Sequence, residues 1–331
     1  SGTLAKAVKL EEGSGRILSH YEYYPNTKYG SHAKKIKYRF DLNTSGTLAK
    51  AVKLEEGSGR ILSHYEYYPN TKYGSHAKKI KYRFDLNTSG TLSKAVKLEE
   101  GSGRVLSWYE YYPNTKYGNH GTKIKYQFDV DQVGYIKKAR KFESGTKKLL
   151  VTYQYLPGTT YGKHGSRING IQLNVPIIRQ LPELPTGCEI TAVTMMLQYK
   201  GANVNKISLA NEMPKHFSNP YFGYVGNPFT KKGWTIYPSA LMKLVRGYAG
   251  NAIDLTGVSN QTLEKKLLSN KPITVWLSPM HGFTVHALTL TGYDPYYYFY
   301  NDPWTGEKNV RISKSKFNTL WKNQAKRAIS Y

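Results

Sequence analysis

A tandem repeat of 44 residues constrains the fold of this 331-residue chain more than any other feature of its sequence. Residues 1–44 are identical to residues 45–88, and a third copy, 89–132, differs from them at a few positions. A fourth copy, 133–168, is short and divergent, as the capping unit of a repeat array usually is. Because a unit of this size buries little apolar surface alone, we expect the copies to stack into an elongated array.

Each copy has the pattern of three β-strands separated by turn signals, which predicts an antiparallel meander and therefore an all-β array. In the first copy the strands are expected at 3–11, 16–24 and 35–42. The third strand alternates apolar and charged residues, so one of its faces should be the core side of the array. The residues of that face are Ile36, Tyr38, Phe40 and Leu42.

Tyrosine and positive charge are concentrated in the array. It contains 19 of the 30 tyrosines, and residues 1–170 carry 30 basic and 14 acidic side chains, or +16 of the formal net charge of +26. The tyrosines can serve as strand residues that pack against cross-strand neighbours, or as aromatic platforms that bind glycan or polyanion beside the basic groups. These two interpretations are compatible, and the remaining alternative is that the array is only a spacer. The charge favours an anionic partner, and the chain has no sequence-specific nucleic-acid motif.

Six histidines follow the repeat without cysteine or carboxylate partners at metal-ligand spacing, so we interpret them as structural or solvent-facing residues. They are His20, His32, His64, His76, His120 and His164. The array as a whole resembles the wall-anchoring repeats of Gram-positive surface proteins and lysins. An anionic cell-wall polymer, such as teichoic acid, would also fit the charge of the chain.

The only cysteine, Cys188, lies where prolines and a glycine give way to helical periodicity. Thr186 is the expected N-cap, and Gly201 should end the helix. A cysteine in the first helical turn is placed to be a nucleophile, because N–H groups and the helix dipole there favour the thiolate. The alternative is a buried structural thiol. A single cysteine excludes an intramolecular disulfide.

The rest of the C-terminal region, from about residue 171, predicts an α+β domain with helices first and strands after. The expected helices are 204–213, 237–247, 262–270 and 315–322; the expected strands are 273–277, 286–292, 296–300 and one at the C-terminus. No apolar run approaches the roughly 20 residues of a membrane span.

Two strand ends should meet in this domain. His286 begins one strand and Asp302 ends the next, so an antiparallel pair would make them neighbours, with the carboxylate fixing the imidazole tautomer. Adjacent strand residues face opposite sides, so only one of Asn301 and Asp302 can reach the imidazole, and we expect it to be Asp302. Asp294 is expected to stabilise the intervening turn, and His281 to lie in a loop at the rim of the site.

Four segments in this order resemble the papain-like cysteine peptidases related to the double-glycine, bacteriocin-processing peptidases, and above all their secreted stand-alone relatives in Gram-positive bacteria. The segments are 180–201, 223–228, 286–294 and 301–306, within a match that covers 171–331. The resemblance implies a papain-like fold with Cys188 as nucleophile, His286 as general base and acid, and Asp302 or Asn301 orienting His286. Gln180 would donate to the oxyanion hole. Glu189, Asn227, Trp234 and Trp304 are the expected substrate-binding residues.

The sequence thus predicts a secreted or cell-surface cysteine peptidase, without metal or organic cofactor, that acts on a peptide or protein substrate and attaches to the wall through its array. One alternative is a peptidoglycan stem-peptide hydrolase on the same fold. Another is a non-enzymatic adhesin whose papain-like domain only binds.

Overall fold

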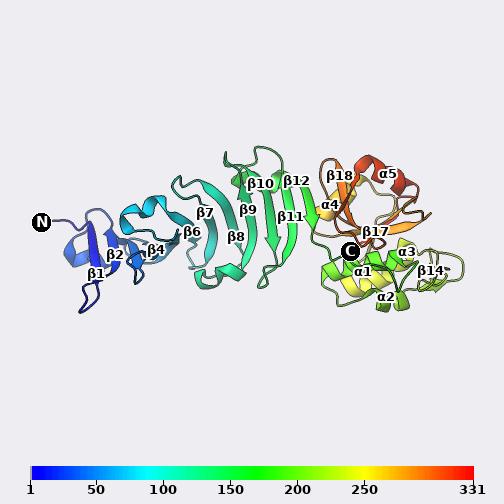
Figure 1. Cartoon of the computed structure of the whole chain (residues 1–331), viewed down its shortest axis with the longest axis horizontal. Helices are drawn as coiled ribbons and strands as arrows, with labels where there is room; N and C mark the ends of the chain where they lie inside the picture. The colour runs from blue at the N-terminus through cyan, green and yellow to red at the C-terminus, as the bar shows by residue number, and fades with distance from the viewer. Residues whose placement is uncertain (1) are drawn as a thin grey trace. The chain divides into compact units, whose positions relative to one another are not determined.

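The computed structural model describes residues 2–331, which form two compact units (Figure 1). The first unit comprises the chain up to Leu149 together with Tyr155–Arg167, and the second comprises Leu150–Gln154 and Ile168–Tyr331. The array and the α+β domain expected from the sequence are therefore both present. Within residues 2–331, none of the helices has the length and apolar character needed to cross a membrane.

The first unit is a continuous antiparallel meander of three strands per repeat, as predicted (Figure 1). The first repeat contains β1 (Lys6–Leu10), β2 (Ile17–Tyr23) and β3 (Ile36–Leu42), and a short 3-10 helix, η1 (Tyr29–Lys34), precedes β3. The later repeats of this unit contain β4 (Leu48–Leu54), β5 (Ile61–Tyr67), η2 (Tyr73–Lys78), β6 (Ile80–Leu86), β7 (Leu92–Leu98), β8 (Val105–Tyr111), η3 (Tyr117–Thr122), β9 (Ile124–Val130), β10 (Ile136–Phe142) and η4 (Tyr161–Ser166). The other two strands of the fourth repeat, β11 (Leu149–Tyr155) and β12 (Ile168–Leu173), belong to the second unit, apart from the two end residues of β11. The 3-10 helices were not expected.

The array does not bury its apolar residues on one side only, as was predicted; both faces of its sheet carry apolar clusters. Three is an odd number of strands, so equivalent strands of successive repeats run in opposite directions, and the register of their pairing makes them present opposite faces. Phe40 lies in a cross-strand row with Ala51 and Tyr65. Its equivalent Phe84 pairs with His64, the neighbour of Tyr65, and therefore faces the other side. Apolar clusters consequently form on alternate faces from one repeat to the next.

Each repeat is joined to the next by the same side-chain contacts. The hydroxyl of Tyr73 donates to the Glu22 carboxylate at 2.6 Å, and the imidazole of His20 stacks on the Tyr73 ring at 3.9 Å. The same hydrogen bond recurs, at 2.7 Å, between Tyr117 and Glu66. The array histidines therefore include structural residues, and neighbouring repeats stabilise each other locally.

The second unit is built on an antiparallel sheet with the strand order β15-β20-β16-β17-β18-β19, and β12 also pairs with β17. Its strands are β15 (Ile253–Asp254), β16 (Ile273–Leu277), β17 (His286–Tyr293), β18 (Tyr297–Asn301), β19 (Val310–Ser313) and β20 (Ala328–Ser330). A separate pair consists of β13 (Lys215–His216) and β14 (Tyr224–Val225). The helices are α1 (Cys188–Lys200), α2 (Lys206–Glu212), α3 (Pro238–Ala249), α4 (Asn260–Leu268) and α5 (Lys314–Lys322). This arrangement is the predicted α+β class.

The core of the second unit lies between α1 and the central strands β16 and β17. Every residue of α1 from Cys188 to Leu197 is buried, and Met196 meets Trp276 and Ala287 in one cluster. The helix ends at Gly201, as predicted, where a φ of 104° suits glycine. Burial on all sides fixes the first turn of α1 against the sheet.

The N-cap of α1 differs from the prediction. Gly187 occupies the cap position, and no side chain caps the helix. The Thr186 hydroxyl donates instead to the carbonyl oxygen of Thr230 at 2.9 Å. Thr186 thus connects the start of α1 to the loop after β14.

Candidate active site

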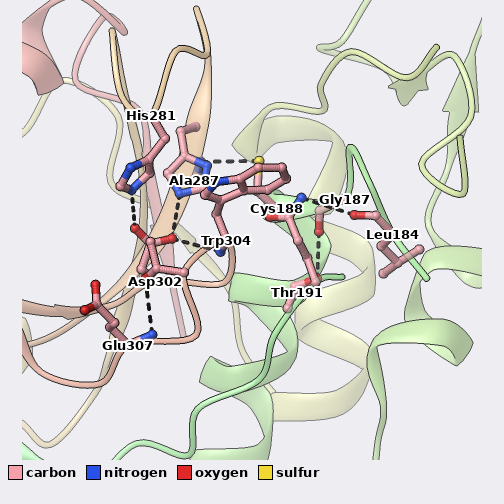
Figure 2. Close-up of polar contacts among 12 residues, drawn as sticks. Leu184, Gly187, Cys188, Thr191, His281, Ala287, Asp302, Trp304 and Glu307 are labelled. Atoms are coloured by element: carbon pink, nitrogen blue, oxygen red, sulfur yellow. Dashed lines mark hydrogen bonds and ion pairs between the residues drawn. The ribbon is translucent and has the colours of Figure 1, made fainter. Parts of the chain in front are cut away.

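Cys188 is the first residue of α1, and its side chain meets the start of β17. The backbone N–H of Ala287 donates to the Cys188 sulfur at 3.5 Å (Figure 2). Because Ala287 follows His286 directly, this contact holds the thiol beside the strand end that carries the histidine. Cys188 and His286 line the same cavity, which has a volume of about 220 Å³.

His286 and Asp302 are in contact, as the strand order predicted. β17 and β18 are antiparallel neighbours, and Nε2 of His286 lies 2.9 Å from Oδ1 of Asp302. Both side chains are 1% exposed. The intervening turn is stabilised by Asp294, as expected, since its carboxylate accepts the backbone N–H groups of Tyr296 and Tyr297.

Asn301 faces away from the imidazole and is engaged elsewhere. Its side-chain amide donates to the carbonyl oxygens of Val175 and Pro176, each at 3.1 Å, and accepts the N–H of Asn309 at 3.0 Å. The structure therefore brings Asp302, rather than Asn301, to His286.

A second histidine also contacts Asp302, and sequence reasoning missed this contact. Nε2 of His281 lies 2.6 Å from Oδ2 of Asp302, so one carboxylate joins two imidazoles (Figure 2). His281 adopts a φ of 51° in the tight turn closed by Met280 and Phe283. His281 lies in the loop and is exposed, as expected for the rim, and the turn also brings its ring to Asp302. The five-residue spacing between His281 and His286 in the sequence does not indicate that both contact the same carboxylate.

The carboxylate of Asp302 is strongly stabilised in its ionised form. Burial alone would raise the pKa of this carboxyl, but hydrogen bonds and the charge of His286, with further bonds from His281 and the Trp304 N–H, lower the pKa to about 2. Asp302 is therefore an anion throughout the neutral range.

The acidity of Cys188 differs from what its helix position predicted. Burial raises the pKa of the Cys188 thiol well above its usual range, and the neighbouring Glu189 carboxylate raises it further. These effects outweigh the backbone N–H bonds to the sulfur. The resting cysteine is therefore a thiol that needs a base to become a nucleophile.

Glu189, one of the expected substrate-binding residues, is a buried acid. Its side chain is 0% exposed; one carboxyl oxygen accepts the Thr235 hydroxyl at 2.5 Å, and the other is buried without a hydrogen bond. Burial raises the pKa of Glu189 to about 7, although the Thr235 hydroxyl opposes the shift. Glu189 thus titrates near neutrality, directly beside the thiol.

Gln180 lines the cavity with Cys188 and His286, as expected. Its amide nitrogen donates to the carbonyl oxygens of Leu184 and Pro185, each at 3.1 Å, while its amide oxygen is buried without a hydrogen bond. Both amide protons are thus used within the loop before α1, although the oxyanion role requires a donor.

The other expected substrate contacts differ in position. Trp234 is 49% exposed and lines the cavity. Trp304 lines an adjoining hollow of about 560 Å³ that shares Lys231 and Phe283 with the cavity. The Asn227 side chain accepts the N–H of Phe229 and so stabilises a turn. The cavity at the thiol therefore continues into the hollow lined by Trp304.

One group within residues 2–331 has the composition of a metal site. Ligand atoms of His281, His286 and Asp302 all lie within 4.8 Å of one another. Two hydrogen bonds to the Asp302 carboxylate account for this closeness. The arrangement fits acid and base chemistry without invoking an ion.

Comparisons with known proteins identify the second unit. Residues 172–329 match the model of the Peptidase_C39 like family. The uncharacterized protein YvpB of Bacillus subtilis (strain 168) is 30% identical over 186 residues, which span 47% of this chain and 74% of that protein.

Two solved structures are also similar. A protein of Bacillus anthracis described as a C39-like peptidase is 34% identical, with a TM-score of 0.45. The match covers 48% of this chain and 94% of the chain of that protein. A double glycine motif protease from an AMS/PCAT transporter, solved with its leader peptide, is 19% identical, with a TM-score of 0.31 over 48% and 90%. The relative from Bacillus subtilis and the family match to 172–329 lead to one conclusion: the chain belongs to the C39-like peptidase family.

Proposed function

We propose that the protein is a cysteine peptidase in which Cys188 attacks the substrate carbonyl, His286 transfers protons and Asp302 orients His286. The observation that carries this proposal is the 2.9 Å contact between His286 Nε2 and Asp302, made at the strand end that also holds the Cys188 sulfur. Because Nε2 is engaged by the carboxylate, Nδ1 is the ring nitrogen that serves the thiol.

Acylation begins with transfer of the Cys188 S–H proton to Nδ1 of His286. The sulfur then forms a bond to the carbonyl carbon of the peptide, whose oxygen becomes an oxyanion. The backbone N–H of Cys188 and the amide of Gln180 are its proposed donors, and Gln180 must exchange one of its loop hydrogen bonds to take part. The His286 imidazolium protonates the departing nitrogen as the C–N bond breaks.

Deacylation uses the same groups in reverse roles. A water molecule loses a proton to Nδ1 of His286 and attacks the thioester carbon. The C–S bond breaks, the acid product leaves, and the proton on Nδ1 returns to the sulfur. The anionic Asp302 stabilises the imidazolium in both halves of the cycle.

Hydrolysis of a peptide library by the full chain and by Cys188→Ala tests this function. The wild-type protein should release new amino termini, and the variant should release none while unfolding at nearly the same temperature. A variant that still hydrolyses peptides, or that loses stability without losing activity, would contradict the nucleophile.

We further propose that the protein is secreted or held at the cell surface of a Gram-positive bacterium, where the array attaches it to an anionic wall polymer. The presence of a single cysteine and a net charge of +26 support this proposal. Removing residues 1–88 deletes 16 basic and 8 acidic side chains. The shortened chain should bind purified walls more weakly and with less dependence on salt, while hydrolysing a small peptide at an unchanged rate. Unchanged wall retention would refute attachment through the array.

A further inference from the structure

Two aromatic pockets occur at equivalent places in successive repeats of the array. The first, which we call the Tyr67 pocket, is lined by Tyr38, Tyr65, Tyr67 and Arg83 and has a volume of about 330 Å³. The second, the Tyr111 pocket, is lined by Tyr82, Tyr109, Tyr111 and Gln127 and has a volume of about 300 Å³. The members of the two sets correspond one to one across 44 residues, so the pockets are products of the repeat itself.

The pockets open on opposite faces of the sheet. Tyr65 of the first pocket pairs across strands with Arg83, whereas its neighbour His64 pairs with Phe84. The row of Phe84 continues through Ala95 and Tyr109 to Gln127, which belong to the side of the second pocket. Adjacent residues of a strand face opposite sides, so a ligand on one face cannot fill both pockets.

The linings favour a sugar ring with acidic groups near it. Aromatic side chains and polar groups converge in each pocket, and both volumes are of the size that small ligands use. A cation lies in each lining, Arg83 in the first and Lys147 in the second. The one carboxylate of the second pocket, Glu66, accepts the Tyr117 hydroxyl at 2.7 Å. The surrounding array carries a net charge of +16 over residues 1–170.

From this placement we propose that the array binds an acidic polysaccharide on both faces and so bridges two polymer chains, with one sugar unit in the Tyr67 pocket and another in the Tyr111 pocket. The inference rests on the proposed attachment role and adds the ligand class, the sites and the bridging. An attachment by charge alone would need neither pocket.

The experiment uses hyaluronan, as a long polymer and as a hexasaccharide, with the full-length chain. Long hyaluronan should produce a strong rise in light scattering, and the hexasaccharide should bind without scattering and should suppress the rise. Tyr67→Ala and Tyr111→Ala should each lower the scattering about tenfold or more, because each removes one face, and the double variant should also lose hexasaccharide binding about tenfold. Tyr67→Phe and Tyr111→Phe, which retain the rings, are the matched controls.

Thermal unfolding of every variant separates a lost site from a lost fold, and Tyr67→Leu or Tyr111→Leu, which keeps apolar bulk without a ring, replaces an alanine variant that does not fold. Dextran, a neutral polysaccharide, tests whether the acidic groups are needed. Polyphosphate, an anionic polymer without sugar, tests whether the sugar is needed. Scattering that is equal with polyphosphate, or that survives in the alanine variants, would overturn the inference. If deleting residues 1–88 abolishes wall retention while the alanine variants retain it, attachment stands and the pockets fail. If that deletion changes nothing, the attachment proposal itself fails.

Discussion

The two units of this protein differ in how they use side-chain contacts: the array repeats the same contacts, whereas the second unit makes a single set at one site. In the array, the same contacts recur at every repeat boundary, such as the Tyr73 hydroxyl on Glu22 and the Tyr117 hydroxyl on Glu66. In the second unit, one core positions Cys188, His286 and Asp302 at the end of one helix and two strands. Repetition spreads stability over many equivalent bonds, whereas the site depends on a few side chains that have no substitutes.

This difference teaches where single substitutions should matter. A nearest-neighbour array loses one contact at a time, because each repeat touches only its neighbours. A catalytic site loses its function when one group is removed, because the groups act together. Single substitutions should therefore have larger effects in the second unit than in the array.

The largest difference in peptide turnover is expected between substitutions of Asn301, the last residue of β18, and Asp302, the residue that follows it. Asp302→Asn should lower peptide turnover by about 10 to 10⁴-fold, because the carboxylate that orients His286 is lost. Asn301→Ala should lower turnover per folded molecule by less than about tenfold. It should instead cost about 2–4 kcal/mol of unfolding free energy, since buried carbonyl groups lose their donors. Turnover and denaturant unfolding of both variants give the comparison, and a larger turnover loss for Asn301→Ala would reverse the assignment.

The buried acid beside the nucleophile should make stability depend on pH. The folded-state pKa of Glu189, about 7, lies above its ordinary value of 4.5, so its contribution is fully present below about pH 4.5 and is lost as the pH rises to about 7. The loss amounts to about 3 kcal/mol. Glu189→Gln should remove this dependence. The wild type should lose stability between pH 4.5 and pH 8, whereas the variant should not, so the stability difference between them should shift in favour of the variant at pH 8. Equal pH dependence in the two proteins would show that Glu189 does not titrate in this range.

The smallest effect is expected in the array. Tyr117→Phe removes the hydrogen bond to Glu66 and retains the ring that stacks on His64, so it should cost about 1 kcal/mol. Peptide hydrolysis should not change. Hydrogen exchange should show faster opening near η3 and β5 only. A loss of protection throughout the array would mean that its repeats unfold as one cooperative body rather than locally.

The sequence predicted the order of elements well because the patterns that specify them are local. Alternation and turn residues located the three strands of each repeat, and helical periodicity located α1 up to Gly201. The approach of His286 to Asp302 also followed, since a short turn at Asp294 joins two antiparallel strands. These features need only neighbouring residues and elementary strand geometry.

What the sequence did not predict depends on contacts between distant segments. The flip of faces between repeats follows from the register of several strands, which no single repeat encodes. The acidity of Cys188 was predicted in the wrong direction because the helix position is visible in the sequence, whereas the burial of Cys188 and Glu189 is not. The contact of His281 with Asp302 was missed because the turn that makes it depends on a left-handed residue.

The most direct test of the central claim is the rate at which iodoacetamide alkylates Cys188 across pH 5 to 9, in the wild type and in His286→Ala. Because burial raises the pKa of the thiol, we expect that His286 is needed to remove its proton. The wild type should react readily at neutral pH, and the variant should react at least about tenfold more slowly there, approaching the wild-type rate only at high pH. Equal rates in the two proteins at neutral pH would contradict a nucleophile activated by His286.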